Sequence, residues 1–360
     1  MKNVPQLRFA GFEGEWEETK LSNIVKINSG RDYKHLSEGK YPVYGTGGLM
    51  TYVSDFLSDE DSVGIGRKGT INKPQKLEAP FWTVDTLFYS IPIKNYNLDY
   101  IYSLFQMINW LKYDESTGLP SLSKTNINNI RIYNTGVQEQ EKIGELFRKI
   151  DALIEKQEGK VSKMEDFKKS MLQKMFPQKG QLVPDFRFEG FDGEWEKKKI
   201  SDIGKISAGG DVDKKKIGNK GRYPVIANGD SNNGIIGYYE DHYKISEPAV
   251  TISARGNIGT AVARNYPFTP VIRVLTLTSD NNIYFMSEAI NRLRIFNESS
   301  GVPQLTSPQF GGYNIFMTKL SEQEKIGQFF KNLDTQIETE EKLLESYKQM
   351  KKSLLQKMFV

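Results

Sequence analysis

The chain has 360 residues, of which 38% are hydrophobic, and it carries a formal net charge of +4 with a sequence pI near 8.8. This length allows two or more domains with sizeable cores, and the mild positive charge permits nucleic-acid binding through local patches without requiring it. The sequence has no cysteine and only two histidines, His35 and His242, which argues against zinc and thiolate sites and against a histidine-based triad. We therefore predict no metal site and no catalytic residues.

Nothing in the sequence indicates a membrane or an export route. No apolar tract is long enough to cross a bilayer, and the opening MKNVPQLRF lacks the apolar stretch of a signal peptide. The absence of cysteine also gives no reason to expect an oxidising compartment. We expect a cytoplasmic protein with no membrane partner.

The first distinctive segment is VPQLRFAGFEGEWE at residues 4–17. It returns at residues 183–196 as VPDFRFEGFDGEWE, with ten of fourteen positions identical. We expect its aromatic residues, Trp16 and Trp195 above all, to pack each opening segment against a domain core. Asp185 and Glu196 in the second copy imitate a PD…ExK nuclease motif, but Gln6 replaces Asp185 in the first copy, so the match is accidental.

Each half continues with short segments rich in β-branched and aromatic residues, which predict strands. These segments are residues 41–45, 62–66 and 81–91 in the first half and residues 249–253 and 271–278 in the second. Residues 98–113 and 281–296 have the pattern of helices. Each half is therefore predicted to be a mixed α/β domain with glycine-rich loops.

The stretch GIGRKGT at residues 64–70 imitates a GxGxxG phosphate-binding loop. Such a loop must open a helix, whereas Pro74 and Asn72 interrupt any helix here. In the second copy Gly64 and Gly66 become Thr251 and Ser253. We expect a β-hairpin whose glycines supply positive φ and whose tip carries a cation, either in solvent or on a phosphate or base.

The two halves match in the same order along their whole length. The first half contains YPVYGTGG, SVGIGRKGT, STGLPSL and EQEKIGELF. The second half has the similar segments YPVIANGD, AVTISARGN, SSGVPQL and EQEKIGQFF in the same order, and both halves end in LQKMF. A repeat of this kind indicates one structural unit used twice. Each half is one domain followed by one tail.

The tails have the period of a coiled coil. Apolar residues recur at alternating intervals of four and three, with Gln157 and Lys168 in the two missing positions. The predicted seam is Ile143, Phe147, Ile150, Ile154, Val161, Met164, Met171 and Met175 in the first tail and Ile326, Phe330, Leu333, Ile337, Leu344, Tyr347, Leu354 and Met358 in the second.

Pairing the two tails with each other buries both apolar stripes. The short connector PQKGQL forces the second helix to run antiparallel to the first and to end near the first domain. About 38 residues per helix at ~1.5 Å each give a rod of roughly 57 Å.

The predicted fold class is α/β, with two similar mixed α/β domains separated by a long antiparallel two-helix coiled coil in a pseudo-twofold duplication. The expected limits are 1–136 and 181–318 for the domains and 137–180 and 319–360 for the helices. A homodimeric or partner-binding coiled coil is the alternative.

The duplicated GEWE, GLPSL/GVPQL and QEQEKIG…LQKMF segments resemble the DNA-specificity subunit of a type I restriction–modification system along essentially the whole chain. The resemblance implies two target recognition domains, each reading half of a split sequence in double-stranded DNA, with the helices as spacer. It also implies two modification subunits, which use S-adenosylmethionine to methylate adenine at N6, and restriction subunits, which use ATP. No cofactor is expected in this chain.

Base reading calls for polar and cationic side chains on loops. Among the recurring loops the candidate DNA-binding residues are Tyr44, Thr46, Arg67, Lys68, Ser121, Ser123 and Lys124 in the first domain and Asn228, Asp230, Arg255, Asn257, Gln304, Thr306 and Ser307 in the second.

Two other functions stay in view. A self-sufficient enzyme would need an Asn-Pro-Pro or Asp-Pro-Pro methyltransferase loop or a GxxxxGK[ST] loop, and the sequence has none of them. A non-catalytic coiled-coil scaffold without DNA sequence selectivity is the remaining alternative, and it predicts partner binding alone.

Overall fold

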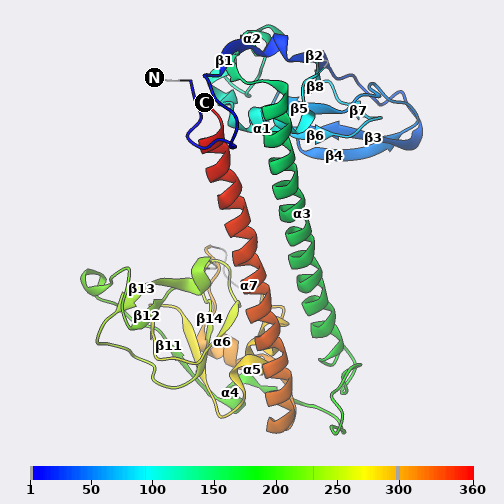
Figure 1. Cartoon of the computed structure of the whole chain (residues 1–360). Helices are drawn as coiled ribbons and strands as arrows, with labels where there is room; N and C mark the ends of the chain where they lie inside the picture. Colours follow the sequence, from blue (N-terminus) through cyan, green and yellow to red (C-terminus); the bar gives the residue numbers. More distant parts are fainter. Residues whose placement is uncertain (1–2, 94, 230, 297–300) are drawn as a thin grey trace. The chain divides into compact units, whose positions relative to one another are not determined.

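The computed structural model describes residues 3–93, 95–229, 231–296 and 301–360. By its internal contacts the chain forms two compact units: unit 1 is Met1–Gly159 with Lys342–Val360, and unit 2 is Lys160–Glu341. Each unit holds one α/β domain and parts of two long helices, α3 (Val137–Lys174) and α7 (Leu320–Met358) (Figure 1). The units thus divide both helices, and the four-segment division expected from the repeat stays a prediction.

The domain of unit 1 contains three small sheets and two short helices. A two-stranded sheet pairs β1 with β9, a four-stranded antiparallel sheet has the order β2-β8-β5-β6, and a three-stranded sheet has the order β4-β3-β7 with β3 and β7 parallel. The bounds are β1 Glu17–Lys20, β2 Val25–Ser29, β3 Glu38–Gly45, β4 Gly48–Val53, β5 Ser62–Gly66, β6 Gln75–Leu77, β7 Trp82–Thr83, β8 Leu87–Pro92, α1 Leu98–Met107, α2 Lys124–Asn129 and β9 Arg131–Asn134.

The domain of unit 2 repeats this topology strand for strand. Its sheets are β10-β18, β11-β17-β14-β15 and β13-β12-β16, and β12 and β16 are again the parallel pair. The bounds are β10 Glu196–Lys199, α4 Ile200–Ile203, β11 Lys205–Ala208, β12 Tyr223–Ile226, β13 Ile235–Tyr239, β14 Ala249–Ile252, β15 Ala261–Arg264, β16 Thr269–Pro270, β17 Leu275–Thr278, α5 Ile283–Asn291, α6 Ser307–Gly312 and β18 Asn314–Met317. The predicted fold class, duplicated mixed α/β domains with two long helices, is confirmed.

Several predicted elements are shorter than their sequence patterns suggested. Residues 81–91 split into β7 and β8 because a turn closed by the Leu87 N–H and the Val84 carbonyl (3.0 Å) interrupts them. In the segment 271–278 the strand begins only at Leu275, since Arg273 has a φ of 70° that no strand residue adopts. The helix predicted over 98–113 ends at Met107, because Ile108 is extended.

The hairpin at GIGRKGT is present, but the reason given for its first glycines is wrong. Gly64 and Gly66 lie inside β5 and do not have positive φ; only Gly69 does, at 84°. A Cβ on Gly66 would stand 2.1 Å from the backbone oxygen of Thr70. Close approach of two backbones, rather than turn conformation, therefore explains Gly66.

The two long helices run antiparallel in both units (Figure 1). In unit 1 Lys351 pairs with Asp151 and Lys348 with Glu158, each at 2.6 Å. In unit 2 Lys168 pairs with Asp334 and Lys160 with Glu340, also at 2.6 Å. In these pairs the residue number on α7 falls as the residue number on α3 rises, so the two helices run in opposite directions. No helix in the described part of the chain is both long and apolar enough to cross a membrane.

The sixteen predicted seam side chains are all buried or half-buried. Ile154, Met164, Met171, Leu344, Tyr347 and Leu354 are the half-buried ones. Gln157, one of the two positions that break the apolar pattern, is itself buried. Lys168, the other, joins three helices: its ammonium contacts Asp334 of α7 and, at 2.8 Å, Glu288 of α5. Burial disfavours the charged lysine, but the two carboxylates outweigh it and raise the pKa of Lys168.

An aromatic cage in each unit holds the phenylalanine that closes LQKMF. Phe359, just after α7, lies among Trp16 (5.9 Å between ring centroids), Tyr100 (5.5 Å, stacked) and Phe147 (6.1 Å) in the core of unit 1. Phe176, just after α3, has the corresponding neighbours in unit 2: Trp195 (5.7 Å), Phe285 (5.3 Å, stacked, in the place of Tyr100) and Phe330 (6.2 Å). The heptad pattern did not include either phenylalanine, because both follow the last residue of their helix, where the repeat no longer applies. The expectation that α7 ends against the first domain is confirmed.

The repeated EQEKIG motif docks each long helix on its domain. Glu139 accepts two hydrogen bonds from Arg8 of the opening segment (2.7 and 2.8 Å), and Glu322 accepts the same pair from Arg187. Gly144 lies against the first turn of α1, where an added Cβ would stand 2.2 Å from Asn97 Oδ1. Asn97 caps α1 by accepting from Tyr100 N (2.9 Å). In unit 1 the motif therefore supplies the carboxylate of an ion pair, the core residue Ile143 and the close contact of Gly144 with α1.

Gly144→Ala is expected to destabilise unit 1 by up to about 2 kcal/mol. Alanine favours a helix over glycine by ~1 kcal/mol, but overpacking against the α1 cap costs ~1–3 kcal/mol. Gly159, also within α3, has nothing within 4 Å of an added Cβ, so Gly159→Ala should stabilise by about 0.5–1 kcal/mol. Urea unfolding of the two variants measures both. Equal shifts of the same sign would show that the Asn97 contact is not restrictive.

Candidate nucleic-acid interface

Each domain brings two of its recurring loops together at one edge. In unit 1 the hairpin tip after β5 pairs with the GLPSL segment: Lys68 and Ser121 form an antiparallel bridge, and Gly69 N donates to Pro120 O (2.8 Å). Leu122 N then donates to Arg67 O (2.9 Å) and carries its side chain into the core. Hairpin and loop form one backbone-bonded element, which the sequence treated as two separate segments.

Unit 2 builds the same element from its own residues. Arg255 bridges Gln304, Gly256 N donates to Pro303 O (3.2 Å), and Leu305 N donates to Ala254 O (2.9 Å). Gly69 and Gly256 have φ of 84° and 79°, so both tips require the left-handed conformation that glycine adopts without strain. We call each combination of hairpin tip and GLPSL-type segment a paired loop: residues 67–70 with 114–124 in unit 1, and 253–260 with 301–307 in unit 2.

The paired loops present cations to solvent. Lys68, Lys124 and Arg255 are exposed, and none of the three has an ion pair within the described part of the chain. Arg67 is different, because its guanidinium lies 5.8 Å from the Phe88 ring centroid and donates to Asp85 O (3.4 Å). Unpaired exposed cations on a fixed loop suit phosphate oxygens, which bind cations by position and charge.

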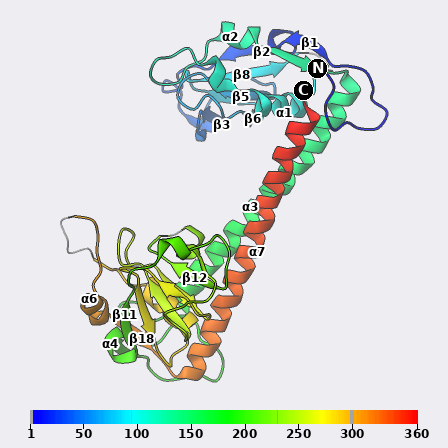
Figure 2. The same cartoon turned by 90° about the vertical axis from the view of Figure 1, so that its left-hand side faces the viewer.

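Two predicted site residues serve as helix caps. Ser123 accepts from Asn126 N (3.2 Å) at the start of α2, and Thr306 forms a capping box with Gln309 at the start of α6. In unit 2, α6 lies beside α4 and β11 (Figure 2). Lys124 and Ser307 are the first residues of these helices. These caps fix the direction in which each GLPSL-type segment enters its helix. The hydroxyls of Ser123 and Thr306 therefore already accept hydrogen bonds within the domain.

Asp114 anchors the paired loop of unit 1, and sequence reasoning missed it. Its Oδ1 accepts from Ser121 N, Ser116 N and Ser116 Oγ, each at 2.9 Å. The bonds from Ser121 and Ser116 hold the pKa of this carboxyl below its usual value. The anchor is therefore fully formed above the ordinary aspartate pKa and is lost only as pH falls through the lowered one. An aspartate before a short Ser-rich turn was the available signal.

The remaining candidates lie on the neighbouring sheet. Tyr44 and Thr46 are at the end of β3, whose Gly45 O accepts from Gln75 of β6 (2.8 Å). The Tyr44 ring packs on Phe81 (6.3 Å between centroids), and burial raises the pKa of Tyr44. In unit 2, Asn228 Oδ1 accepts from Ala254 N (2.7 Å) and so braces the Arg255 tip.

Two candidates complete the second set. The exposed Asn257 follows Gly256, and its carbonyl accepts from Ser253 Oγ. Asp230 lies outside the described residues. The structure thus brings Arg67, Lys68, Ser121, Ser123 and Lys124 into one paired loop and Arg255, Asn257, Gln304, Thr306 and Ser307 into the other, which Asn228 contacts from the loop after β12. Tyr44 and Thr46 belong to the adjacent sheet end.

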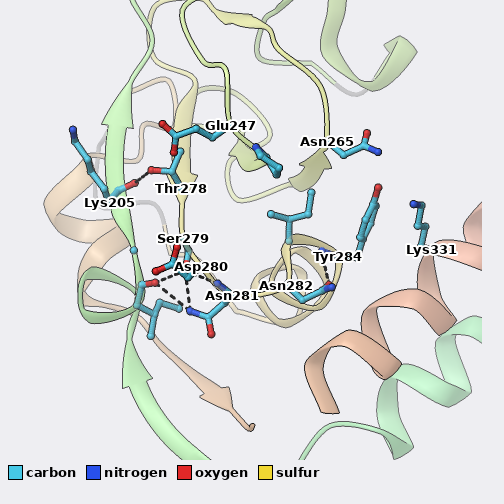
Figure 3. A pocket seen from close by; sticks show the side chains of 14 residues that line it. Lys205, Glu247, Asn265, Thr278, Ser279, Asp280, Asn281, Asn282, Tyr284 and Lys331 are labelled. Carbon is cyan, nitrogen blue, oxygen red and sulfur yellow. Dashed lines mark hydrogen bonds between the residues drawn. The ribbon is translucent and has the colours of Figure 1, made fainter. Parts of the chain in front are cut away.

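A separate cavity of about 730 Å³ in unit 2 holds none of the candidates (Figure 3). Its wall includes Lys205, Tyr284 and Lys331, with the Lys331 ammonium 4.7 Å from the Tyr284 ring centroid. Three of its asparagine and serine side chains are engaged within the domain: Asn282 caps α5, and Ser279 Oγ and Asn281 Nδ2 both donate to Ile203 O. Because none of the candidate residues lines this cavity, the paired loops remain the candidate interface.

Comparison with known proteins identifies the family to which the chain is similar. The family described as "Type I restriction modification DNA specificity domain" matches residues 13–165 and 192–349. A putative type I specificity subunit of Mycoplasma pneumoniae, S.MpnORF507P, is 29% identical over 107 residues, which is 29% of each chain. A second from the same organism, S.MpnORF89P, is 26% identical over 139 residues, or 35% of this chain and 41% of that protein. The matches therefore span less than half the length of either relative.

One solved structure is similar over its whole length. The type I restriction–modification S subunit from M. genitalium superposes with a TM-score of 0.79 and covers 99% of both chains, at 15% sequence identity. At this identity the likeness establishes the fold alone. Two duplicated domains and two long helices are thus an arrangement already seen in a crystal structure.

Proposed function

This chain belongs to the type I restriction–modification DNA specificity family, and we propose that each of its α/β domains reads one half of a split DNA target. The observation that carries the proposal is the duplicated paired loop. Unit 1 presents Lys68 and Lys124, and unit 2 presents Arg255, each exposed and without an ion pair among the described residues, on a loop that backbone hydrogen bonds and helix caps hold in place. A fixed loop of this kind can position a domain on phosphates while neighbouring polar side chains reach base edges.

The two paired loops differ in the side chains at matching places. Lys68 and Ser121 of unit 1 correspond to Arg255 and Gln304 of unit 2. Arginine and lysine both contact guanine edges, glutamine forms a bidentate pair with adenine, and serine contacts either, so the readers at these places are not equivalent. We therefore propose unlike half-sites for the two domains. Because the two DNA-binding domains are linked in one chain, the chain binds tightly only to DNA that carries both half-sites.

The chain supplies selectivity, and partner chains supply the chemistry. We propose that it directs modification subunits, two per chain, and restriction subunits to the split site in cytoplasmic DNA. S-adenosylmethionine and ATP would bind those partners. The alternative, a coiled-coil scaffold without sequence selectivity, rests on the long helices alone and leaves the duplicated paired loops without a role.

Methylation mapping tests the proposal. In a methylation-free host, this chain expressed with its modification subunit should produce methylated adenines in a split motif that the modification subunit alone does not produce. Replacing residues 183–318 by the same segment of another specificity subunit should change one half of the motif. Replacing residues 4–135 should change the other half.

The exchanges serve as controls for each other, because both leave the long helices intact. Absence of chain-dependent methylation from an assembled, soluble complex would reject the proposal in favour of the scaffold. A change in both halves after either exchange would contradict the assignment of one half-site to each domain.

A further inference from the structure

An exposed apolar side chain lies at the same place in both paired loops. Leu119 in GLPSL is 67% exposed and Val302 in GVPQL is 58% exposed. The last leucine of each segment behaves in the opposite way, since Leu122 and Leu305 are 2% and 3% exposed and belong to the domain cores. Each segment thus directs one apolar residue inward and one outward, in two domains with different sequences.

The outward residue is presented from rigid backbone. The residue after it is proline in both copies, and that proline's carbonyl accepts from the glycine of the hairpin tip. In unit 1 the neighbouring Ser121 N is also tied to Asp114 (2.9 Å). A side chain on so constrained a loop loses little entropy when it becomes buried in a partner.

Each outward residue shares its paired loop with exposed cations. Lys68 and Lys124 belong to the same paired loop as Leu119, and Arg255 belongs to that of Val302; all three cations are exposed. The acidic residues of the unit 1 loop, Asp114 and Glu115, accept hydrogen bonds from Ser121 N and Ser123 Oγ of that loop. An exposed apolar side chain on a loop with exposed cations complements a polyanion with apolar surface inside it. Duplex DNA has this character, because phosphates line the grooves and stacked bases form their floor.

We propose that Leu119 and Val302 are wedges that press between stacked bases, one in each half-site, while the flanking cations hold the phosphates. The inference rests on the proposed function. Apolar side chains inserted at a base step partly unstack it, and the energy needed for unstacking depends on the step. Each wedge would therefore contribute to which sequences its domain accepts, without any hydrogen bond to a base.

The test uses the complex of the full chain with its modification subunit and a duplex carrying the split motif found by methylation mapping. 2-Aminopurine, whose fluorescence rises on unstacking, is placed at single non-methylated positions of each half-site. With saturating wild-type complex, one position per half-site should brighten. Leu119→Ala should abolish the rise in one half-site only, and Val302→Ala in the other only.

Affinity and salt dependence separate the wedge from a cation. Leu119→Ala should weaken binding on the order of tenfold, since it loses roughly the burial of a leucine side chain, and Leu119→Met should retain binding. The slope of log K against log salt should not change, because no counterion is released by an apolar contact. Lys68→Gln, by contrast, should reduce that slope by about 1.

Failure of the wedge is distinguishable from failure of the proposed function. If Leu119→Ala and Val302→Ala keep the motif, the affinity and the wild-type fluorescence, the wedge is overturned while sequence-specific reading stands. If the wild-type chain directs no methylation, the proposed function fails first. Unchanged thermal unfolding of both alanine variants, expected for exposed side chains, ensures that the comparison concerns DNA contact.

Discussion

Phe359→Ala should lower the stability of unit 1 by about 3–5 kcal/mol, the usual cost of emptying a buried aromatic site. Phe359 is only 6% exposed and contacts three rings, Trp16, Tyr100 and Phe147, which alanine cannot reach. Aromatic pairs add to the simple loss of buried area. Because Phe359, with Leu355 and Met358, attaches the end of α7 to the domain core, its loss should also loosen the nearby helix pairing.

Hydrogen exchange measured by mass spectrometry checks this result segment by segment. Phe359→Ala should reduce protection in unit 1, and its counterpart Phe176→Ala should reduce protection in unit 2. Val360→Ala, at a position 48% exposed, is the matched neighbour and should leave both units unchanged. Equal loss of protection in both units from Phe359→Ala would contradict a cage that acts within its own unit.

Glu139→Ala should destabilise unit 1 by about 3 kcal/mol. The Glu139 side chain is 2% exposed and that of Arg8 14%, so removing the carboxylate leaves a largely buried guanidinium that, among the described residues, keeps Gly14 O (2.6 Å) as its one acceptor. Breaking a buried pair by removing one partner costs ~3–5 kcal/mol, and the residual exposure of Arg8 favours the lower end. Thr135 Oγ1 also loses its carboxylate acceptor.

The comparison with Glu139→Gln isolates the charge. Glutamine keeps an acceptor for Arg8 and fills the same volume, so it should cost clearly less than alanine. Glu322→Ala should act in the same direction in unit 2 but cost less, because Arg187 donates to Asp192 O (2.9 Å) as well as to Gly193 O and so keeps two acceptors. Urea unfolding combined with segment-resolved hydrogen exchange gives both values. If Glu139→Ala left the free energy of unfolding unchanged, the ion pair between Arg8 and Glu139 would not be what holds the opening segment.

The paired loops show where sequence reasoning stopped. Lys68 and Ser121, like Arg255 and Gln304, were selected because their segments recur, but no sequence pattern indicated that the two segments form one bridge. The contact joins residues more than forty positions apart, and such pairings depend on how three sheets pack. The hydroxyls of Ser123 and Thr306 could have been assigned as caps, because a helix follows each directly.

The sequence by itself determined the duplication, the strand-rich character of each domain, the period of the long helices and their antiparallel direction. These follow from local pattern and chain connectivity, since apolar periodicity and a short connector act over neighbouring residues. Only the tertiary structure decided that Phe176 and Phe359 close aromatic cages, that Lys168 joins three helices, and that Leu119 and Val302 face outward. The physical reason is that burial and partnership depend on segments distant in sequence, and identical letters such as the two leucines of GLPSL acquire opposite environments only when those segments meet.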